Sequence, residues 1–275
     1  MNNPRRFAYL AGLPRTGSTV LGTLLSQHPD VYSSRTSCLR DMMNQVKEFS
    51  LGESPYYDRK DPKSPCWGIM RGMLYGAYEG VSEEIVLEKD RGWSASVSLA
   101  ETLTGERPKI LSPVRRVSEI ISSFVLISQQ IGKQSKIEDE LRLANRESNP
   151  WALSRIIWER YVYANWRVFK TGYENDSDCF LLLDYDDIVA KPRETLGLVC
   201  TYLDIEPWAP ATTGLVNPSP ENDAVYGLKG LHTVRSDLKR VSPPPEVVLG
   251  EECCEWWDSQ GLEFWKSFWG KTVQE

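Results

Sequence analysis

The sequence predicts an α/β fold built on a central parallel β-sheet with helices on both faces. Three observations predict this fold: apolar runs typical of buried strands, helical hydrophobic patterns between most of these runs, and a strand–loop–helix segment close to the N-terminal end. Strands that alternate with helices imply βαβ crossovers, and such crossovers join parallel strands whose two faces are both covered.

Four apolar runs have the length and composition of buried strands. They are Phe7–Leu13, Ile85–Glu88, Lys109–Val114 and Cys179–Asp184. Helical spacing of apolar residues predicts four helices, at Ser18–Gln27, Val117–Ile131, Trp151–Lys170 and Pro192–Leu203. By composition, three stretches are exposed loops: Gly52–Pro65, Asn217–Asn222 and Ser242–Pro245.

The composition is that of an ordinary folded protein, with 41% hydrophobic and 25% charged residues. We expect one domain over residues 1–275, with a helical segment at about residues 245–270 packing back on the body. Four tryptophans crowd this segment: Trp256, Trp257, Trp265 and Trp269. The net charge of −6 argues against a general nucleic-acid binder, although a few local Arg and Lys residues can still hold an anion.

The cysteines and histidines do not predict a metal site. The six cysteines contain no C-x-x-C pair, and the chain has two histidines. No disulfide framework is indicated, which favours a reducing compartment. The run Phe7–Leu13 is short for a signal-peptide core, and no apolar stretch reaches membrane-spanning length. We therefore expect a soluble, cytoplasmic protein without a metal.

The loop after the first predicted strand carries the features of an anion site. GLPRTGST (Gly12–Thr19) has glycines spaced as in G-x-x-x-x-G-K-[ST], which makes the fold P-loop-like. Gly17 lets the backbone approach an anion, and the following helix presents free N–H groups and the positive end of its dipole. Ser18 and Thr19 add hydroxyl donors.

The loop lacks the lysine of nucleoside triphosphatases, because Ser18 stands in its place. Those enzymes need the lysine on the terminal phosphates, with a magnesium site beside it. Arg15 supplies a positive charge instead. A lysine-free loop of this kind suits a phosphate or phosphosulfate that needs no metal.

GLPRTGST, followed by a helix ending in QHPDV, resembles the phosphosulfate-binding loop of sulfotransferases that use 3′-phosphoadenosine 5′-phosphosulfate (PAPS). The likeness is to the bacterial and tyrosylprotein branches, which carry an arginine in the loop. The resemblance implies a sulfotransferase architecture and a sulfuryl transfer that releases adenosine 3′,5′-bisphosphate (PAP). It implies that Arg15 stabilises charge on the bridging oxygen. The 5′-phosphate would then lie against residues of the loop: Pro14, Arg15, Thr16, Gly17, Ser18 and Thr19.

A second anion site is implied where the third predicted strand ends. The family places an arginine there and a serine eight residues later, both on the 3′-phosphate, and Arg115 and Ser123 have that spacing. Arg116 and Val117 depart from the family's R-D-P pattern. The alternative for Arg115 is a solvated surface charge.

Three further contacts follow from the resemblance. Lys89, after the second predicted strand, would contact the transferring sulfuryl group, or else form a structural ion pair with Glu88 or Asp90. Tyr185 would lie against the nucleotide, or else be a tyrosine at the rim. A loop closing over the phosphates would supply Lys229, Gly230 and Arg235.

The general base has no matching residue, because the stretch that would hold the family's glutamate, Ser33–Ser37, has no acid. Asp41 is the nearest following carboxylate and is the catalytic candidate, with Glu48 and His232 as rivals. An ordinary surface aspartate on a helix explains Asp41 equally well.

Two other functions stay open. A P-loop kinase would use Gly12–Thr19 for the nucleotide and Asp184 for magnesium, and a non-catalytic nucleotide-binding protein would keep the loop without turnover. For the transferase, we expect a hydroxyl or amine acceptor that is a small molecule, a lipid or a carbohydrate.

Overall fold

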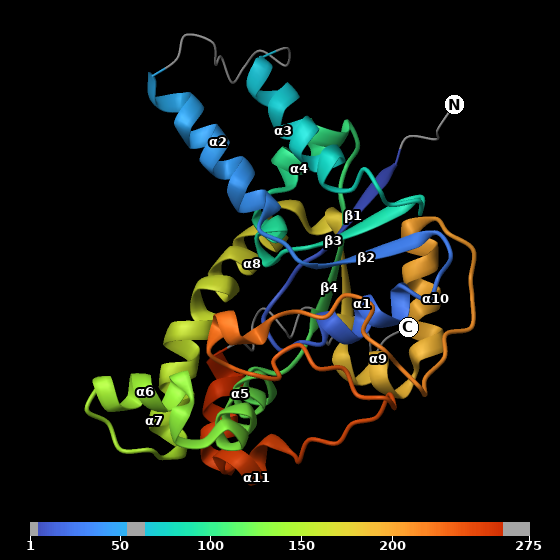
Figure 1. Cartoon of the computed structure of the whole chain (residues 1–275). Coiled ribbons are helices and arrows are strands. Elements are labelled where there is room, and N and C mark those ends of the chain that lie inside the picture. Colours follow the sequence, from blue (N-terminus) through green and yellow to red (C-terminus); the bar gives the residue numbers. More distant parts are fainter. Residues whose placement is uncertain (1–4, 54–63, 261–275) are drawn as a thin grey trace.

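The sheet contains five parallel strands. In a computed structural model that describes residues 5–53 and 64–260, they lie in the order β2-β3-β1-β4-β5 (Figure 1). All neighbouring strands pair in parallel, as the alternation of strands and helices predicts. The strands are β1 (Arg6–Leu10), β2 (Val31–Thr36), β3 (Ile85–Lys89), β4 (Lys109–Val114) and β5 (Phe180–Asp184).

The sequence does not predict β2. Its residues, VYSSRT, form neither an apolar run nor a strict alternation. The strand lies at the edge of the sheet and pairs only with β3. Its small Ser33 serves packing, since a Cβ added to Gly22 on the neighbouring helix would lie 2.6 Å from the Ser33 Oγ.

Three helices cover one face of the sheet. They are α1 (Ser18–Leu25), α9 (Tyr185–Ala190) and α10 (Pro192–Leu203). Their apolar side chains form one buried cluster with Ala8 and Leu10 of β1. Tyr9 of the same strand belongs to the cluster on the opposite face. Because successive side chains of a strand point to opposite faces, β1 contributes to both cores.

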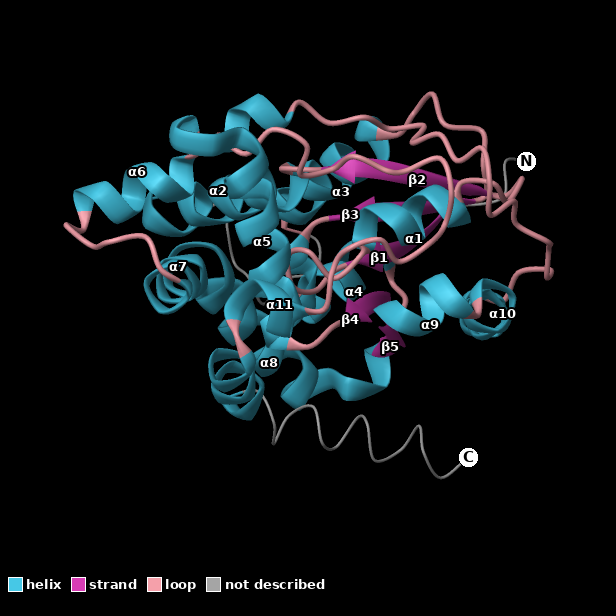
Figure 2. Cartoon of the chain, turned by 90° about the horizontal axis from the view of Figure 1, so that it is seen from below, coloured by secondary structure: helices cyan, strands magenta, loops and turns pink. Residues whose placement is uncertain are grey.

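The opposite face carries most of the remaining helices, and Figure 2 shows the two sets on either side of the strands. These helices are α2 (Leu39–Glu53), α3 (Pro65–Ala77), α4 (Val97–Thr104), α5 (Val117–Ile131), α6 (Lys136–Leu143), α7 (Pro150–Ile157), α8 (Tyr163–Asp176) and α11 (Pro245–Leu249). Four 3₁₀ turns connect elements: η1 (Arg91–Ala95), η2 (Gly132–Gln134), η4 (Ser177–Cys179) and η5 (Asp223–Tyr226). None of the described helices is long and apolar enough to cross a membrane.

The long helix predicted over Trp151–Lys170 is interrupted. A π-helical turn (Trp158–Val162) joins α7 to α8, which continues to Asp176. A π turn adds a single residue to the helical repeat, so the apolar periodicity conceals it. The bounds of α5, α10 and β4 are those predicted, and α1 ends two residues before Gln27.

Two of the predicted loops are shorter in the structure, since Pro65 begins α3 and Pro245 begins α11. Gly52 and Glu53 belong to α2, because its amphipathic pattern extends one turn further than the loop composition suggests, and residues 54–63 lie outside the described residues. Asn217–Asn222 is irregular, as predicted.

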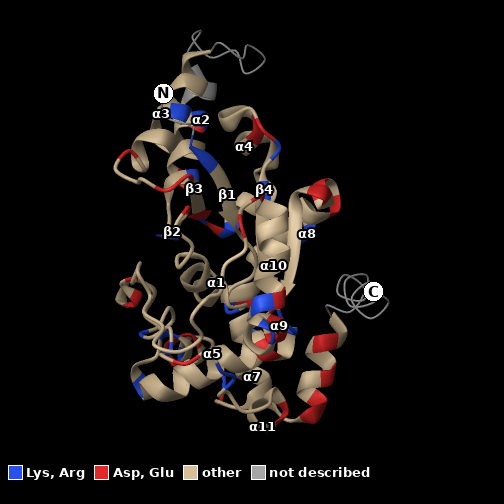
Figure 3. Cartoon of the chain, turned by 90° about the vertical axis from the view of Figure 1, so that its right-hand side faces the viewer, with Lys and Arg blue, Asp and Glu red and all other residues tan. Residues whose placement is uncertain are grey.

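The C-terminal segment is helical as far as the structure describes it. Residues 251–260 form a helix that follows α11, with Trp257 buried and Trp256 partly exposed. Trp265 and Trp269 lie outside the described residues. Figure 3 shows acidic residues along this helix.

The carboxyl ends of the strands meet at one edge of the sheet. β1 leads into residues 11–17, β3 into η1, β4 into Arg115 and β5 into Tyr185. β1 lies between β3 and β4, so the order of strands reverses beside it. Open parallel sheets bind ligands at this edge, where the strand order reverses.

Candidate active site

The loop between β1 and α1 has a conformation that its glycines allow. Gly12 and Gly17 have φ values of 146° and 101°, and Arg15 has φ 63°. No side chain caps the N-terminus of α1, and its first turn contains no acidic residue. The first N–H groups of a helix lack partners within it, so this end of α1 can receive an anion.

Gly17 packs directly against Tyr185. A Cβ added at Gly17 would lie 2.5 Å from the Cδ2 of Tyr185, closer than side chains can approach. The position therefore requires glycine both for its backbone angle and for this contact. The loop and the first residue of α9 meet without a gap.

Two other residues of this loop, Pro14 and Thr16, are buried inside the protein. Pro14 is buried and has no N–H group. Thr16 is fully buried, and its Oγ1 donates to the carbonyl oxygen of Leu13 at 2.8 Å. The side chain of Thr16 thus holds the loop in shape.

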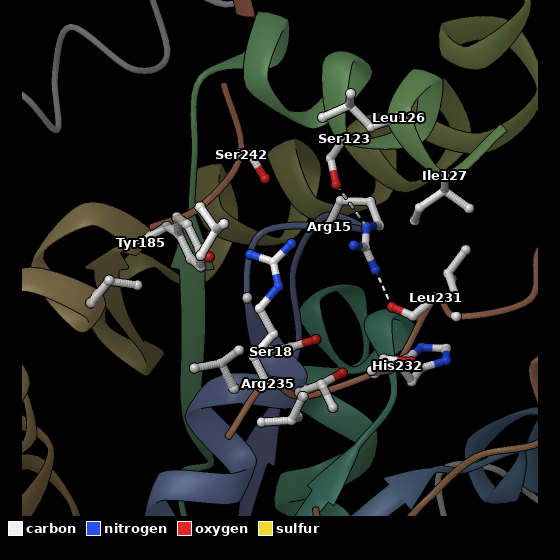
Figure 4. Close-up of a pocket in the computed structure, with 18 of the residues that line it drawn as sticks. Arg15, Ser18, Ser123, Leu126, Ile127, Tyr185, Leu231, His232, Arg235 and Ser242 are labelled. Carbon is white, nitrogen blue, oxygen red and sulfur yellow. Dashed lines mark hydrogen bonds between the residues drawn. The ribbon is translucent and has the colours of Figure 1, made fainter. Parts of the chain in front are cut away.

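A pocket of 510 Å³ opens above this loop (Figure 4). Its volume is in the range of small-molecule sites. Nine residues predicted for the site line it: Arg15, Gly17, Ser18, Thr19, Arg115, Ser123, Tyr185, Gly230 and Arg235.

Arg15 lies between α5 and the loop that contains Leu231 (Figure 4). Its Nε donates to the Oγ of Ser123 at 3.1 Å, and its Nη1 donates to the carbonyl oxygen of Leu231. Burial, followed by the repulsion from Arg115, lowers the pKa of Arg15 to about 10. The side chain remains a cation at neutral pH.

Arg115 forms the opposite wall. Its guanidinium lies 4.4 Å from the centre of the Tyr185 ring, a cation–π geometry. Its Nη1 donates to the carbonyl oxygen of Arg15 at 3.2 Å. Its buried Nε lies 3.5 Å from the Oε2 of Glu119 and makes no hydrogen bond. Arg115 therefore keeps spare donor capacity.

Lys89 lies beside this pocket and does not line it. Its Nζ is 2.7 Å from the Oε1 of Glu221 and 3.1 Å from the Oγ1 of Thr19. Thr36 also donates to that Glu221 oxygen, through its N–H at 3.1 Å and its hydroxyl at 3.0 Å. The ion pair is with Glu221, not with Glu88 or Asp90.

Besides Pro14, Thr16 and Lys89, three further candidates from the sequence do not line the pocket. Asp41 is 66% exposed on α2 and pairs with Arg40. Glu48, further along α2, is exposed. Lys229 is exposed, although the adjacent Gly230 lines the pocket.

Asp184, the carboxylate that a kinase would use for magnesium, caps α9. Its Oδ1 accepts from the N–H of Asp186 at 2.7 Å, and burial raises its pKa to about 6. It does not line the pocket. Among the residues described, no three His, Cys, Asp or Glu side chains gather as metal ligands would.

The sequence model of the sulfotransferase family matches residues 8–210, well over half of the chain. The chain belongs to the sulfotransferase family. No curated protein matches its sequence significantly.

Solved sulfotransferase structures resemble the fold. A sulfotransferase domain from the curacin biosynthetic pathway is 16% identical, with a TM-score of 0.52 over 94% of this chain and 98% of that one. Sulfotransferase STF9 from Mycobacterium avium is 13% identical, with a TM-score of 0.50 over 95% of this chain and 77% of that one. At such low identity, the likeness supports the α/β fold alone.

Residues that lie after the matched range also reach this part of the structure. Glu221, Asp223, Leu231 and His232 follow residue 210, and they reach the end of β3 and the phosphate loop. Sequence reasoning found His232 only as a rival base, and it missed Glu221 and Asp223. Their loop carries no local motif, so only the folded chain brings them to the site.

His232 is held by an aspartate. Its Nδ1 lies 2.6 Å from the Oδ1 of Asp223, and the other oxygen of Asp223 accepts the N–H of His232 at 3.0 Å. The Oε2 of Glu221 lies 3.4 Å from the same Nδ1. Burial lowers the pKa of His232 below its usual value, despite the hydrogen bond to Asp223. With Nδ1 bonded to Asp223, Nε2 is the ring nitrogen that can accept a proton.

Glu88 is a fully buried carboxyl beneath the site, at 0% exposure. Tyr78 donates its hydroxyl to Oε2, Ser34 donates to the same oxygen at 3.2 Å, and the Nε1 of Trp93 lies 3.4 Å from Oε1. Burial raises the pKa of Glu88. Its partners belong to β2, α3 and η1, so it fixes these elements around the end of β3.

Proposed function

We propose that this sulfotransferase transfers the sulfuryl group of PAPS to a hydroxyl or amine of a small-molecule, lipid or carbohydrate acceptor. The donor specificity, the acceptor class and the residue roles are part of this proposal. So are its place in the arginine-loop branch, its organisation as one domain and its cytoplasmic location.

The observation that carries the proposal is that two neighbouring groups of residues suited to bind anions line one pocket. The uncapped N-terminus of α1 with Arg15 forms one, and Arg115 with Ser123 forms the other. PAPS carries a phosphosulfate at one end and a 3′-phosphate at the other. Tyr185 lines the same pocket between the loop and Arg115, where its rim can contact the nucleotide.

The residues fit this donor better than a nucleoside triphosphate. Ser18 replaces the lysine of the triphosphatase loop, and Asp184 is engaged as a helix cap. Arg115 lines the pocket and has guanidinium N–H groups beyond its bond to the carbonyl oxygen of Arg15, which an anion in the pocket could accept. The kinase alternative gains no comparable support.

In the proposed reaction, the acceptor oxygen or nitrogen forms a bond to sulfur. The bond between sulfur and the bridging oxygen breaks, and its electron pair leaves with PAP. Arg15 would stabilise the charge that develops on that oxygen. The acceptor proton would pass to Nε2 of His232, which the geometry favours over the exposed Asp41.

The acceptor would approach along α5. Leu126, Ile127 and Gln130 line the pocket beyond Ser123 at helical spacing, and Leu231 faces them. This wall is mostly apolar, which supports an acceptor that has an apolar part.

Calorimetric titration with PAP and with ATP–magnesium tests the proposal. We expect metal-independent binding of PAP that weakens in Arg15→Ala and Arg115→Ala, with little binding of ATP–magnesium. Preference for ATP–magnesium, or no binding of PAP, would overturn it. After that test, acceptors can be screened by release of PAP.

A further inference from the structure

Two basic side chains follow β3, at Lys89 and Arg91, and the structure treats them differently. Lys89 is neutralised: its ammonium bonds to Glu221 at 2.7 Å, and the two side chains are 9% and 6% exposed. It contacts the phosphate loop only through the hydroxyl of Thr19. An ammonium already paired with a buried carboxylate is a poor receptor for a second anion.

Arg91 lines the pocket, together with Arg15, Ser18 and His232. Within residues 5–53 and 64–260, its guanidinium makes no hydrogen bond and no ion pair. The adjacent carboxylate of Asp90 is engaged elsewhere, since its Oδ1 accepts from the N–H of Gly92 at 2.6 Å and from the Nε of Arg40 at 3.2 Å. Arg91 is therefore a cation at the pocket wall whose guanidinium is not paired with a carboxylate among the described residues.

The segment that carries Arg91 is held in place by packing. It opens η1, where Trp93 is 1% exposed and lies against the ring of Tyr9 at 4.5 Å. A Cβ added to Gly172 of α8 would lie 1.7 Å from the carbonyl oxygen of Ser94, so α8 presses directly on this turn. A side chain on a backbone held this firmly can be aimed at a ligand.

Arg91 interacts electrostatically with other charged residues of the site. Burial lowers the pKa of Arg91, and Tyr226, Asp90 and Glu221 offset this only in part. Arg91 in turn contributes to lowering the pKa of Arg15, after burial and Arg115. Two guanidinium groups that repel each other across a pocket are stabilised when an anion lies between them.

We propose that Arg91, and not Lys89, is the basic residue that contacts the sulfuryl oxygens of the donor. This inference rests on the proposed function. While the acceptor–sulfur bond forms and the bond from sulfur to the bridging oxygen breaks, Arg91 holds the equatorial oxygens of the sulfuryl group and Arg15 receives the charge on the leaving oxygen. Lys89 instead ties the loop of Glu221 to the sheet.

The test compares the affinities of PAPS and PAP, which differ only by the sulfuryl group, and it needs no acceptor. In Arg91→Ala, we expect PAPS to bind at least about tenfold more weakly, the effect of one charge-assisted hydrogen bond, while PAP changes by less than about threefold. Arg91→Lys keeps the charge and should lose less. Arg167→Ala, on the exposed side of α8, is the matched control and should leave both affinities unchanged.

Retained PAP binding shows in the same titration that the variant is folded. If Arg91→Ala weakens PAPS and PAP equally, or neither of them, Arg91 does not contact the sulfuryl group and the inference fails. If Lys89→Ala loses affinity for PAPS alone and Arg91→Ala does not, Lys89 is the residue that contacts the sulfuryl group. If the wild-type protein does not bind PAP, the proposed function fails first, and the inference fails with it.

Discussion

The Nε of Arg15 donates a hydrogen bond to the Oγ of Ser123 across 3.1 Å, and this contact joins two residues predicted for opposite ends of the donor. Arg115 belongs to the same cluster of side chains, because it donates a hydrogen bond to the carbonyl oxygen of Arg15. The phosphosulfate site and the 3′-phosphate site are thus directly connected. We expect a bound donor to replace the Arg15–Ser123 hydrogen bond with bonds from each residue to its own anion.

The first prediction concerns the 3′-phosphate. Arg115→Ala should abolish most of the preference for PAP over adenosine 5′-monophosphate, which lacks that group. Loss of a charged hydrogen-bonding partner corresponds to about tenfold or more in affinity. Ser123→Ala should reduce the same preference less, because a neutral hydroxyl contributes less. Calorimetry with both nucleotides measures the ratio. An unchanged ratio in Arg115→Ala would place the 3′-phosphate elsewhere.

The second prediction concerns the phosphate loop. Gly17→Ala should weaken PAP binding by at least about tenfold and destabilise the fold by about 1–3 kcal/mol, because an alanine there is strained at φ 101° and meets the Tyr185 ring at 2.5 Å. Gly197→Ala is the matched control: this glycine lies within α10 with open space around it.

In the control, alanine should stabilise the protein slightly, because it has the higher helix propensity. Thermal unfolding and calorimetry separate the two effects. If Gly17→Ala bound PAP like the wild type, the loop and Tyr185 would not form the wall that the structure shows.

The sequence predicts the parts of the fold that depend on local pattern. The bounds of α5 and α10 agree with the structure, because apolar spacing and a proline at the start of α10 define them. The edge strand β2 is not predicted because its two serines are buried by contacts that no local pattern encodes: Ser33 packs against Gly22, and Ser34 bonds to Glu88.

The sequence also predicts those residues of the site that follow the ends of strands. Gly17, Arg115 and Tyr185 follow strand ends, and parallel strands bring such residues together. The partner of Lys89 was not predictable in this way, since Glu221 is 132 residues away in an irregular loop. The sequence indicates Lys89 instead of Arg91 because Lys89 matches the family by position. The ion pair between Lys89 and Glu221 distinguishes the two residues, and it is visible only in the fold.

The third prediction concerns stability. Glu88→Gln should destabilise the protein by about 1–3 kcal/mol in acid, because the protonated carboxyl has one donor and the amide has two, and the second amide N–H displaces a hydrogen bond that Tyr78 or Ser34 donates to Glu88. Urea unfolding measures the difference. Glu84→Gln, a partly exposed residue of the same region paired with Arg6, should change stability by less than about 1 kcal/mol.

The difference between wild type and Glu88→Gln should depend on pH. Burial raises the pKa of Glu88 above 4.5, so the folded state holds this proton more tightly than the unfolded state does. The contribution is complete below the unfolded pKa and is lost as the pH rises through the folded one. The advantage of the wild type should therefore shrink as the pH rises above 4.5. A difference that grows with pH would show that Glu88 is ionised in the folded protein.

The fourth prediction concerns the general base. The slow hydrolysis of PAPS, with water as the acceptor, should lose rate as the pH falls through the pKa of His232, because only the neutral ring accepts a proton. Burial lowers that pKa below 6.5, so the rate should be level at neutral pH and fall only in acid. His232→Gln should reduce the rate by about a hundredfold and remove this dependence.

Two further variants separate the roles within this group. Asp223→Asn should keep PAP affinity but lower the hydrolysis rate, since the amide no longer fixes the proton on Nδ1 of His232. Asp41→Asn should keep the wild-type profile, because Asp41 lies exposed on α2 and does not line the pocket. If Asp41→Asn loses the rate while His232→Gln keeps it, the base is the aspartate and the acceptor approaches from α2 instead of along α5.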